Sequence, residues 1–243
     1  MKQKIYCLKE GSQEELEEEI VEEAPLFLTI NNRIKRILLR TPGEDKPLLT
    51  GMSLTDGLIR RKEEIISIHT AGNIAEMEIK LIQGLPEPEE IDDIFNGVIK
   101  SALRRDKDRK IRVGELLKLM NMMESRQELR ERTKASHAAM LFSYKLEPIC
   151  ISEDVGRHNA LDKVIGKALL EERIGDVFMA TLSSRISFEM AKKAVIAGIK
   201  VLMGISRPTS MAILLGEKAG MSIVTLARDG GIMVFSKKER IGA

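Results

Sequence analysis

Four short segments of this sequence combine an arginine with serine, threonine or glycine, a mixture suited to binding a negatively charged ligand. They read Ser152-Glu153-Asp154-Val155-Gly156-Arg157-His158-Asn159, Ser183-Ser184-Arg185, Ser206-Arg207-Pro208-Thr209-Ser210 and Arg228-Asp229-Gly230-Gly231. Arginine suits this chemistry because its planar guanidinium makes paired hydrogen bonds to phosphate oxygens. In the alternative, structural interpretation, the hydroxyl side chains cap helices and the arginines pair with Glu153, Asp154 and Asp229. The occurrence of four such segments favours a phosphate or pyrophosphate ligand.

The first segment also carries groups that could move a proton. Asp154, Arg157 and His158 lie within one helical turn, and His137 lies at the start of a neighbouring predicted strand. A histidine with a pKa of about 6.5 can donate, accept or shuttle a proton near neutral pH. Two interpretations stay open: a small nucleotide-binding enzyme that uses Asp154 and His158 as acid and base, or a capped, salt-bridged helix terminus.

Other chemistries lack their motifs. The sequence has no His-x-Glu with Pro-Cys-x-x-Cys, no phosphate-binding loop ending in Gly-Lys-Ser/Thr and no Gly-x-Ser-x-Gly, which argues against a zinc deaminase, a P-loop enzyme and an α/β-hydrolase. Three histidines and two cysteines are scattered, so we expect no metal site. Cys150, between Ile149 and Ile151, is expected to be a packed, inert thiol, and Cys7 to lie in a mobile terminus.

The elements that must position these segments form a regular series after residue 136. Strands are predicted at 137–142, 148–152, 177–182, 200–205, 222–227 and 232–236, and helices at 158–170, 188–197 and 209–219. Strands that alternate with helices predict a largely parallel sheet covered by helices, and Gly230-Gly231 predicts an antiparallel hairpin at one edge. Because ligands bind outside the carboxyl ends of such strands, the four segments are expected to meet at one sheet edge.

The first half of the chain has a different pattern. An acidic run over 10–23 predicts a flexible or helical lead-in. Residues 26–39 predict a hairpin that turns at Asn31-Asn32, residues 48–58 a helix, and residues 64–68 and 76–82 two strands. The resulting division is an acidic lead-in (1–20), a small α+β domain (21–88), a helical connector with a basic loop at 104–110 (89–134), and an α/β/α domain (135–243).

Length and composition limit the size of the core, the classes of partner and the cellular compartment that can be expected. The 243 residues are 43% hydrophobic and 31% charged, with a formal charge of +2. The length predicts about 11,000 Å² of surface when folded, so a sizeable core can form without disulfides. The near balance of charge gives no global argument for a nucleic-acid or membrane partner. No long apolar run or signal peptide is present and the two cysteines are isolated, so a cytoplasmic protein is expected.

Residues 153–166, EDVGRHNALDKVIG, closely resemble the FdhD-type formate dehydrogenase accessory sulfurtransferase family. Further segments follow in the family's order. They are 184–189 (SRISFE), 197–199 (AGI), 206–210 (SRPTS) and 227–228 (AR). In the first half, 40–45 (RTPGED), Gly51 and 54–59 (LTDGLI) look like the family's N-terminal motif. The resemblance spans roughly residues 21–236.

The resemblance implies a C-terminal half similar to the cytidine-deaminase-like three-layer α/β/α sandwich with a mixed sheet, preceded by a smaller α+β domain. It also implies transfer of sulfur, as a cysteine persulfide, from a cysteine desulfurase to the bis-guanine-dinucleotide molybdenum cofactor of formate dehydrogenase. GDP or GTP would then act as surrogate ligands, and a homodimer is compatible with this function. The implied cofactor-binding residues are Leu226, Ala227, Arg228, Asp229, Gly230 and Gly231, and the arginine segments add Arg157, His158, Arg185, Arg207, Thr209 and Ser210.

The sequence departs from the family at its sulfur-carrying loop. Family members usually have a C-x-x-C loop before His137, whereas residues 100–110 here read KSALRRDKDRK. Without a thiolate no persulfide forms at that position. Either the protein binds and delivers the cofactor without transferring sulfur, or Cys150 substitutes as the carrier.

Overall fold

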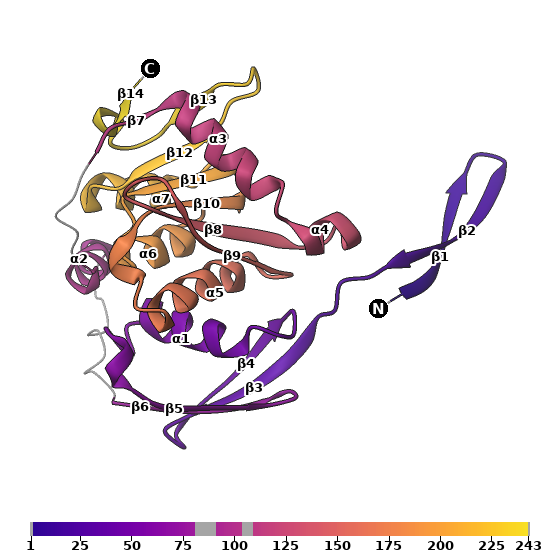
Figure 1. Cartoon of the computed structure of the whole chain (residues 1–243), viewed down its shortest axis with the longest axis horizontal. Coiled ribbons are helices and arrows are strands. Elements are labelled where there is room, and N and C mark those ends of the chain that lie inside the picture. The colour runs from indigo at the N-terminus through magenta and orange to yellow at the C-terminus, as the bar shows by residue number, and fades with distance from the viewer. Residues whose placement is uncertain (1, 81–90, 104–108, 243) are drawn as a thin grey trace.

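The computed structural model describes residues 2–80, 91–103 and 109–242 of the chain. It is a mixed α/β protein with several sheets, in which a hairpin at the N-terminus projects away from a compact body (Figure 1). Among the helices of the described residues, none combines the length and the apolar character that crossing a lipid bilayer requires.

The projecting hairpin pairs β1 (Lys2–Lys9) with β2 (Ser12–Glu19). The prediction of a flexible or helical acidic lead-in is therefore wrong, and Cys7 lies within β1. Antiparallel pairing places Glu19 opposite Lys2 and Glu17 opposite Lys4, and Lys4 Nζ also forms a 2.6 Å ion pair with Oε1 of its diagonal neighbour Glu15. Cross-strand pairs of opposite charge stabilise such a ladder.

A four-stranded sheet with the order β4-β3-β6-β5 follows. Its strands are β3 (Ala24–Ile30), β4 (Ile34–Arg40), β5 (Ile65–Ala71) and β6 (Ile74–Ile79), and one face packs against α1 (Asp45–Thr55). The predicted hairpin is confirmed: Asn31 and Asn32 take left-handed φ angles of 50° and 55° in the turn between β3 and β4. The predicted helix and the two later strands are confirmed as well.

The middle of the chain is helical, as predicted, with one unpredicted strand. It contains α2 (Ile91–Ser101), β7 (Ile111–Arg112), α3 (Val113–Glu124) and α4 (Glu128–Thr133). β7 pairs in parallel with the equally short β14 (Ile241–Gly242). Two-residue strands carry too little alternation to be detected in a sequence. Of the predicted basic loop, residues 104–108 lie outside the described residues.

The C-terminal sheet has six strands in the order β13-β12-β11-β10-β8-β9. They are β8 (His137–Ser143), β9 (Pro148–Asp154), β10 (Val177–Arg185), β11 (Val201–Ser206), β12 (Ser222–Leu226) and β13 (Ile232–Val234). β10, β11 and β12 are parallel, and the remaining pairings are antiparallel. The sheet is therefore mixed, and the expectation of a largely parallel sheet holds only for its centre, because the short connection between β8 and β9 forces antiparallel pairing.

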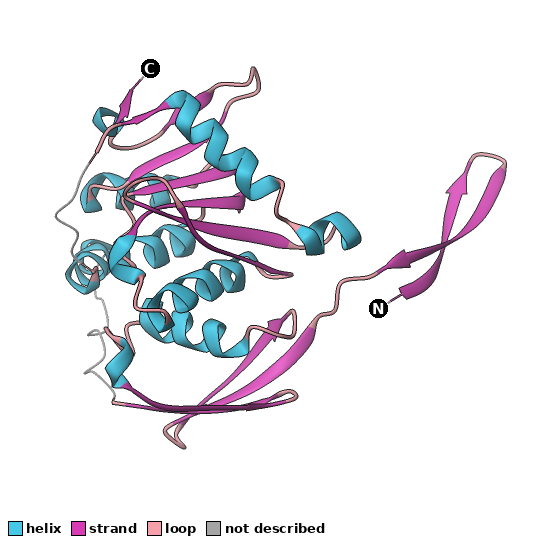
Figure 2. Cartoon of the chain, in the orientation of Figure 1, coloured by secondary structure: helices cyan, strands magenta, loops and turns pink. Residues whose placement is uncertain are grey.

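Helices cover both faces of this sheet (Figure 2). One face packs against α5 (Arg157–Leu170), α6 (Phe188–Ile196) and α7 (Ser210–Ala219), and the other packs against α3. Alternation along β8 explains the two cores, because Ala139 and Leu141 belong to the first and Met140 and Phe142 to the second.

The two halves of the chain join where α1 crosses α5. The crossing depends on glycine, since a Cβ atom built on Gly51 would lie 1.9 Å from the carbonyl oxygen of Asp162, and one on Gly166 would lie 1.8 Å from that of Pro47. Such close backbone approach is what glycine permits. The core that contains α5 consequently continues through α1 into the N-terminal sheet.

Candidate functional site

The four arginine-bearing segments lie at one edge of the six-stranded sheet. β9, β10, β11 and β12 all run in the same direction, so their carboxyl ends share an edge, and each of these ends leads into one segment. β8 runs the opposite way and therefore begins at this edge with His137. The topology thus brings together the ends of elements far apart in the sequence, and we call this region the carboxyl edge.

Arginine charge at the carboxyl edge is not neutralised by the protein. Arg185, Arg207 and Arg228 are exposed, and Arg157 is partly buried. Within residues 2–80, 91–103 and 109–242, no ion pair joins any of the four to a carboxylate, and the buried Nε of Arg157 has no hydrogen-bond partner. A buried guanidinium N–H without a partner is costly. The arrangement is therefore suited to an anion that supplies oxygen acceptors.

Two histidines lie in the same region, and Arg157 acts on both. Burial lowers the pKa of His137, and the charges of Arg130 and Arg157 lower it further. Burial also lowers the pKa of His158, assisted by Arg157 and Lys193 and opposed by Glu189. Both imidazoles are therefore neutral near pH 7 and can donate or accept a hydrogen bond. The Nδ1 atom of His137 lies 3.4 Å from the hydroxyl of Ser183, which accepts from the Ala138 amide at 2.7 Å.

The hydroxyl residues of these segments divide into two groups. Thr209 caps α7, because its Oγ1 accepts from the Ala212 amide at 3.4 Å, so its side chain follows the structural interpretation. Ser210, next to it, is exposed. Ser187, which sequence reasoning did not single out, begins α6 with a buried hydroxyl that has no hydrogen-bond partner within the described part of the chain.

The last segment forms the connection between β12 and β13. The Ala227 amide donates to the Gly231 carbonyl at 2.8 Å, and Gly230 has a φ of 84° that favours glycine. Leu226, Ala227 and Gly231 are partly buried, whereas Arg228, Asp229 and Gly230 are exposed at the tip. Asp229 accepts a 3.4 Å hydrogen bond from the Gly231 amide rather than pairing with an arginine. The segment therefore presents the Arg228 guanidinium to solvent.

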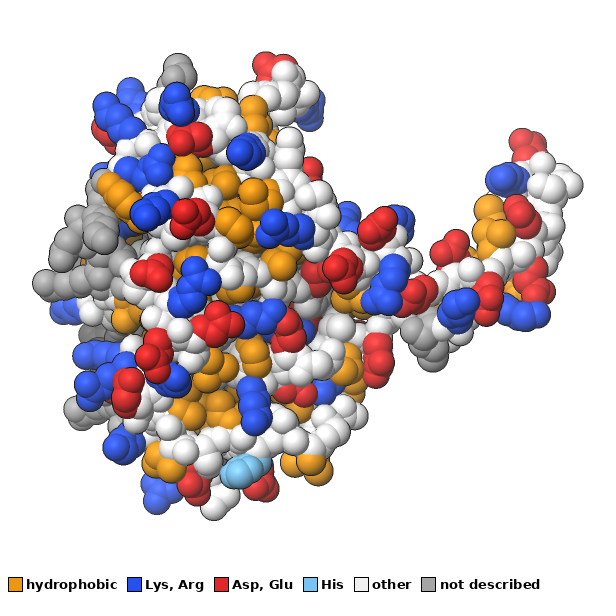
Figure 3. All heavy atoms as spheres, in the orientation of Figure 1, with side chains coloured by type: hydrophobic (Ala, Val, Ile, Leu, Met, Phe, Trp, Pro, Cys, Tyr) orange, Lys and Arg blue, Asp and Glu red, His pale blue; other side chains and the backbone are white. Residues whose placement is uncertain are grey.

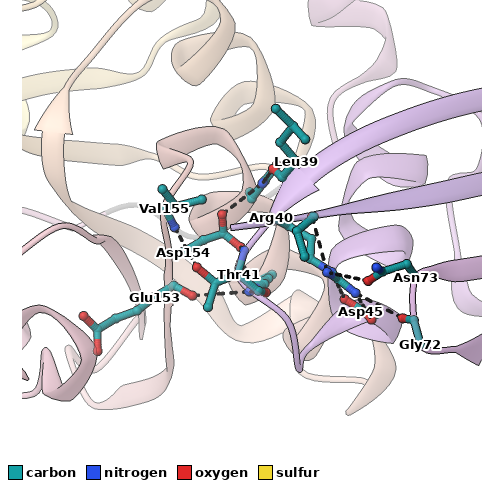
Figure 4. Close-up of polar contacts among 12 residues, drawn as sticks. Leu39, Arg40, Thr41, Asp45, Gly72, Asn73, Glu153, Asp154 and Val155 are labelled. Atoms are coloured by element: carbon teal, nitrogen blue, oxygen red, sulfur yellow. Dashed lines mark hydrogen bonds and ion pairs between the residues drawn. The ribbon is translucent and has the colours of Figure 1, made fainter. Parts of the chain in front are cut away.

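Asp154 has a structural role (Figure 4). It is completely buried, and its carboxylate lies 2.7 Å from Lys163 Nζ. The carboxylate also accepts from the Thr41 and Gly156 amides at 3.1 and 2.8 Å and from the Asn159 side chain at 2.9 Å. These four donors leave the carboxylate no access to a ligand, so the hypothesis that Asp154 acts as an acid or base is wrong.

Partners from the first half of the chain hold this carboxylate. Besides the Thr41 amide, the Thr41 hydroxyl accepts from the Val155 amide at 3.0 Å, and the Thr41 carbonyl accepts from Lys163 at 3.0 Å. The preceding Arg40, 1% exposed, donates to Asp45 at 2.8 Å, and also contacts Asn73 and the Gly72 carbonyl (Figure 4). Residues 40–45 and 153–163 therefore form one buried joint between the halves of the chain.

A second buried ion pair lies at the α1–α5–α6 junction and was not anticipated. Lys193 Nζ donates to Asp162 at 2.8 Å and to the Thr55 hydroxyl at 2.9 Å, and that hydroxyl donates to Asp162 at 2.8 Å. Burial raises the pKa of Asp162, and Lys193 acts in the opposite direction. The charge of Lys193 also lowers the pKa of His158, so this pair acts on a histidine of the carboxyl edge.

Cys150 is poorly placed for sulfur chemistry. Burial raises the pKa of the Cys150 thiol to about 12, and its Sγ lies 3.4 Å from the Val164 carbonyl, facing α5. A thiolate is therefore strongly disfavoured there. In the described part of the chain, no group of three or more His, Cys, Asp or Glu residues is arranged to hold a metal ion.

The opposite edge of the sheet contains a cavity that sequence reasoning missed. It has a volume of about 500 Å³ and is lined by Arg109, Lys110, Lys237, Glu239 and Arg240. Arg240 places it at the amino ends of the strands, because it donates to the Lys200 carbonyl and the Ser222 hydroxyl. The only signal in the sequence was the basic run at 104–110.

Comparison with known proteins gives a consistent result. Residues 21–242 match the model of the FdhD/NarQ family. The sulfur carrier protein FdhD of Mycolicibacterium paratuberculosis is 33% identical over 252 residues, covering 93% of this chain and 92% of that protein. The FdhD of Sulfolobus acidocaldarius is 32% identical over 249 residues, covering 99% and 98%. The fold is similar to a crystal structure of a candidate formate dehydrogenase accessory protein from Desulfotalea psychrophila, with a TM-score of 0.83 and 24% identity, over 100% of this chain and 99% of that one.

Proposed function

Because this chain belongs to the FdhD/NarQ family, we propose that it is a formate dehydrogenase accessory protein that binds the bis-guanine-dinucleotide molybdenum cofactor at the carboxyl edge. The observation that carries the proposal is that, within the described residues, the four arginines have no acidic partner and the buried Arg157 Nε has no acceptor. The guanine dinucleotide brings pyrophosphate groups, which supply acceptors of the kind that arginine binds best.

The residues at the carboxyl edge would make different contacts with the ligand according to their positions. Arg157, Arg185, Arg207 and Arg228 would contact phosphate oxygens, and the exposed backbone of residues 226–231 would bind alongside them. Ser210 and Ser187 would contribute hydroxyl groups. His137 and His158, neutral by virtue of their lowered pKa values, would accept or donate hydrogen bonds without adding charge. The molybdenum cofactor is cargo in this proposal, held and passed to formate dehydrogenase.

For sulfur, we favour binding and delivery of the cofactor without a persulfide on Cys150. The sequence has no C-x-x-C pair, and a thiol with a pKa of about 12 supplies almost no thiolate at neutral pH. A cysteine desulfurase, the partner that the family resemblance implies, can be used to test whether either cysteine accepts sulfur. Incubation of the protein with cysteine and a cysteine desulfurase, followed by mass spectrometry, should leave both Cys7 and Cys150 without added sulfur. Sulfur on either cysteine would restore the sulfur-carrier function that its relatives' name states.

We also propose a domain architecture and a cellular compartment for the protein. The three-layer C-terminal half, residues 135–243, would be a cytidine-deaminase-like sandwich, with residues 21–88 as a smaller domain and residues 89–134 as the connector. The cytoplasm is the setting we propose, since two unpaired cysteines fit a reducing compartment.

Calorimetry with GDP tests the site directly. GDP should bind the full chain, and Arg228→Ala should weaken binding by about 1.5 to 3 kcal/mol, or about 10- to 150-fold, through loss of a charge-assisted contact. Arg60→Ala is the matched control, because Arg60 is also exposed but lies between α1 and β5. Absence of GDP binding to the unaltered protein at millimolar ligand would refute the proposal.

A further inference from the structure

The cavity at the amino ends of the strands is basic, and the proposed function does not use it. We call it the amino-edge cavity. Among the described residues, four cations and one carboxylate line its volume of about 500 Å³: Arg109, Lys110, Lys237, Arg240 and Glu239. Figure 3 shows lysine and arginine side chains gathered over β7 and β14, at the upper left of the view. A cavity of this size accommodates a small molecule, and the charge of its walls favours an anion.

The pairing of β7 with β14 brings these cations together from segments far apart in the chain. Ile111 pairs with Ile241 in a parallel register, and both pack against the core that contains α3. Residues 109–110 directly precede β7, and residues 237–240 directly precede β14. Because the two strands are parallel, both basic segments lie at the same end of the pair. The fold itself therefore assembles the basic walls of the cavity.

The guanidinium of Arg109 is held in place by its neighbours. Its Nη1 donates to the Tyr144 carbonyl at 2.9 Å, and its Nη2 donates to a carboxylate oxygen of Glu115 at 3.1 Å. Its Cζ also lies 5.9 Å from the centre of the Tyr144 ring, which packs edge-on against the core residue Phe178. A charged group that is already ordered loses less conformational entropy when it binds a ligand.

A buried serine holds the other basic segment. The hydroxyl of Ser222, the first residue of β12, donates to the Lys237 carbonyl at 2.8 Å and accepts from Nη1 of Arg240 at 2.8 Å. The same Nη1 donates to the Lys200 carbonyl at 3.3 Å, and Lys237 Nζ lies 3.4 Å from a carboxylate oxygen of Glu217. Arg240 and Lys237 are therefore tied to the amino ends of the strands.

Nearby glutamates neutralise only part of the positive charge. Glu239 belongs to the lining, Glu115 pairs with Arg109, and Glu217 pairs with Lys237. Three carboxylates thus accompany the four cations of the lining, and two further exposed cations, Arg112 and Lys238, flank the lining residues in the sequence. A cleft lined by charge of one sign concentrates the electric field. The remaining positive charge favours a ligand that carries several negative charges.

We propose that the amino-edge cavity binds a compound with two adjacent phosphoryl groups, at a site separate from the carboxyl edge. Arg109 and Arg240 come from the two basic segments, and a planar guanidinium makes paired hydrogen bonds to phosphoryl oxygens. Lys110 and Lys237 supply further positive charge from the same two segments. The ligand is either free pyrophosphate or the diphosphate end of a small organic molecule, and both share the chemistry that the cavity recognises.

Fluorine NMR of the full chain labelled with 3-fluorotyrosine tests the proposal at the cavity itself. The chain has two tyrosines: Tyr144 contacts Arg109, and Tyr6 lies on the N-terminal hairpin and serves as the internal control. The variant Tyr6→Phe assigns the two signals. Titration with inorganic pyrophosphate should shift the Tyr144 signal to saturation and leave the Tyr6 signal unchanged. Tighter binding of pyrophosphate than of ADP indicates the free ion, and the reverse order indicates a diphosphate ester.

Variants of the lining should weaken this titration. Arg240→Ala removes a guanidinium and should raise the dissociation constant for pyrophosphate at least about tenfold. Lys110→Glu reverses an exposed charge and should raise it at least about fivefold. Lys110→Glu keeps the test valid if far-UV circular dichroism shows that Arg240→Ala disturbs the fold. Lys35→Glu, the same change at an exposed position on β4, is the matched control and should leave the dissociation constant unchanged.

The same titration separates this site from the carboxyl edge. In Arg228→Ala, pyrophosphate should shift the Tyr144 signal as in the unaltered protein, because Arg228 lies at the opposite edge of the sheet. Three results would overturn the proposal: no saturable shift of Tyr144 at millimolar pyrophosphate, equal weakening by Lys35→Glu and Lys110→Glu, or loss of the shift in Arg228→Ala.

Discussion

Replacing Asp154 by asparagine should destabilise the whole fold. Asp154 is fully buried and accepts from four donors: Lys163 and Asn159 side chains and the Thr41 and Gly156 amides. Asparagine keeps one acceptor oxygen but presents an NH₂ group where donors already point. Breaking a buried ion pair by removing one partner costs about 3 to 5 kcal/mol. The carbonyls of Thr41 and Glu153, which also accept from Lys163 at 3.0 and 3.3 Å, offset part of that cost.

The expected loss is about 4 kcal/mol of unfolding free energy, a large share of the roughly 5 to 15 kcal/mol typical of a folded domain. Urea unfolding followed by far-UV circular dichroism measures it, since the chain has no tryptophan for fluorescence. Asp229→Asn, an exposed aspartate in the last segment, is the control and should leave the free energy unchanged within about 0.5 kcal/mol.

A double variant isolates the ion pair itself. Combining Asp154→Asn with Lys163→Met should cost less than the sum of the two single changes, because no unpaired lysine charge then stays buried. The structural role of Asp154 would be refuted if Asp154→Asn unfolded within about 1 kcal/mol of the unaltered protein while GDP binding was lost. That result would return Asp154 to the ligand site.

Three further outcomes follow from the same geometry. Gly51→Ala should lower the unfolding free energy by at least about 2 kcal/mol, because the new Cβ would overlap the carbonyl of residue 162. The control Gly114→Ala, with open space around the new Cβ, should be neutral or stabilising. Equal effects of the two changes in urea unfolding would contradict the close crossing of the helices. The pKa values of His137 and His158 lie below the ordinary 6.5, so the unfolded chain takes up protons first and the unfolding free energy should fall as pH is lowered through about 6.5. In an NMR titration, GDP should raise the pKa values of both histidines. Unchanged pKa values would show that the histidines do not lie near the ligand. Cys150→Ala should cost about 1 kcal/mol, and Cys150 in the folded protein should resist thiol reagents at mildly alkaline pH; rapid labelling would contradict its raised pKa.

Much of the fold follows from local patterns in the sequence. The Asn31-Asn32 turn and the Gly230 turn were predictable because few residues tolerate left-handed backbone. The strands and helices after residue 136 alternate clearly enough to predict their shared carboxyl edge. The N-terminal hairpin was not predicted, because its glutamates dominate the composition and hide a short alternation that only cross-strand pairing with Lys2 and Lys4 makes favourable.

The positive charge of the site was predictable from the sequence, but it was not predictable which of its charged residues are buried and hold the structure together. Charged residues are usually exposed, so nothing in the sequence indicated that Asp154, Asp162, Lys163 and Lys193 are buried. Their burial depends on contacts between segments more than a hundred residues apart, such as Thr41 with Val155. Long-range contacts of this kind have no local signature. The family motif at 153–166 therefore combines two residues of the carboxyl edge, Arg157 and His158, with buried residues that hold the structure together.

The buried joint between residues 40–45 and 153–163 has a consequence for how the molecule comes apart. Neither half can leave the other without exposing the paired charges of Asp154 and Lys163 and opening the continuous core at the α1–α5 crossing. Unfolding should therefore be a single cooperative transition with coincident melting of both sheets. A fragment that begins at residue 135 would carry Asp154 without the Thr41 amide and α5 without its glycine-lined partner, and it should fail to fold.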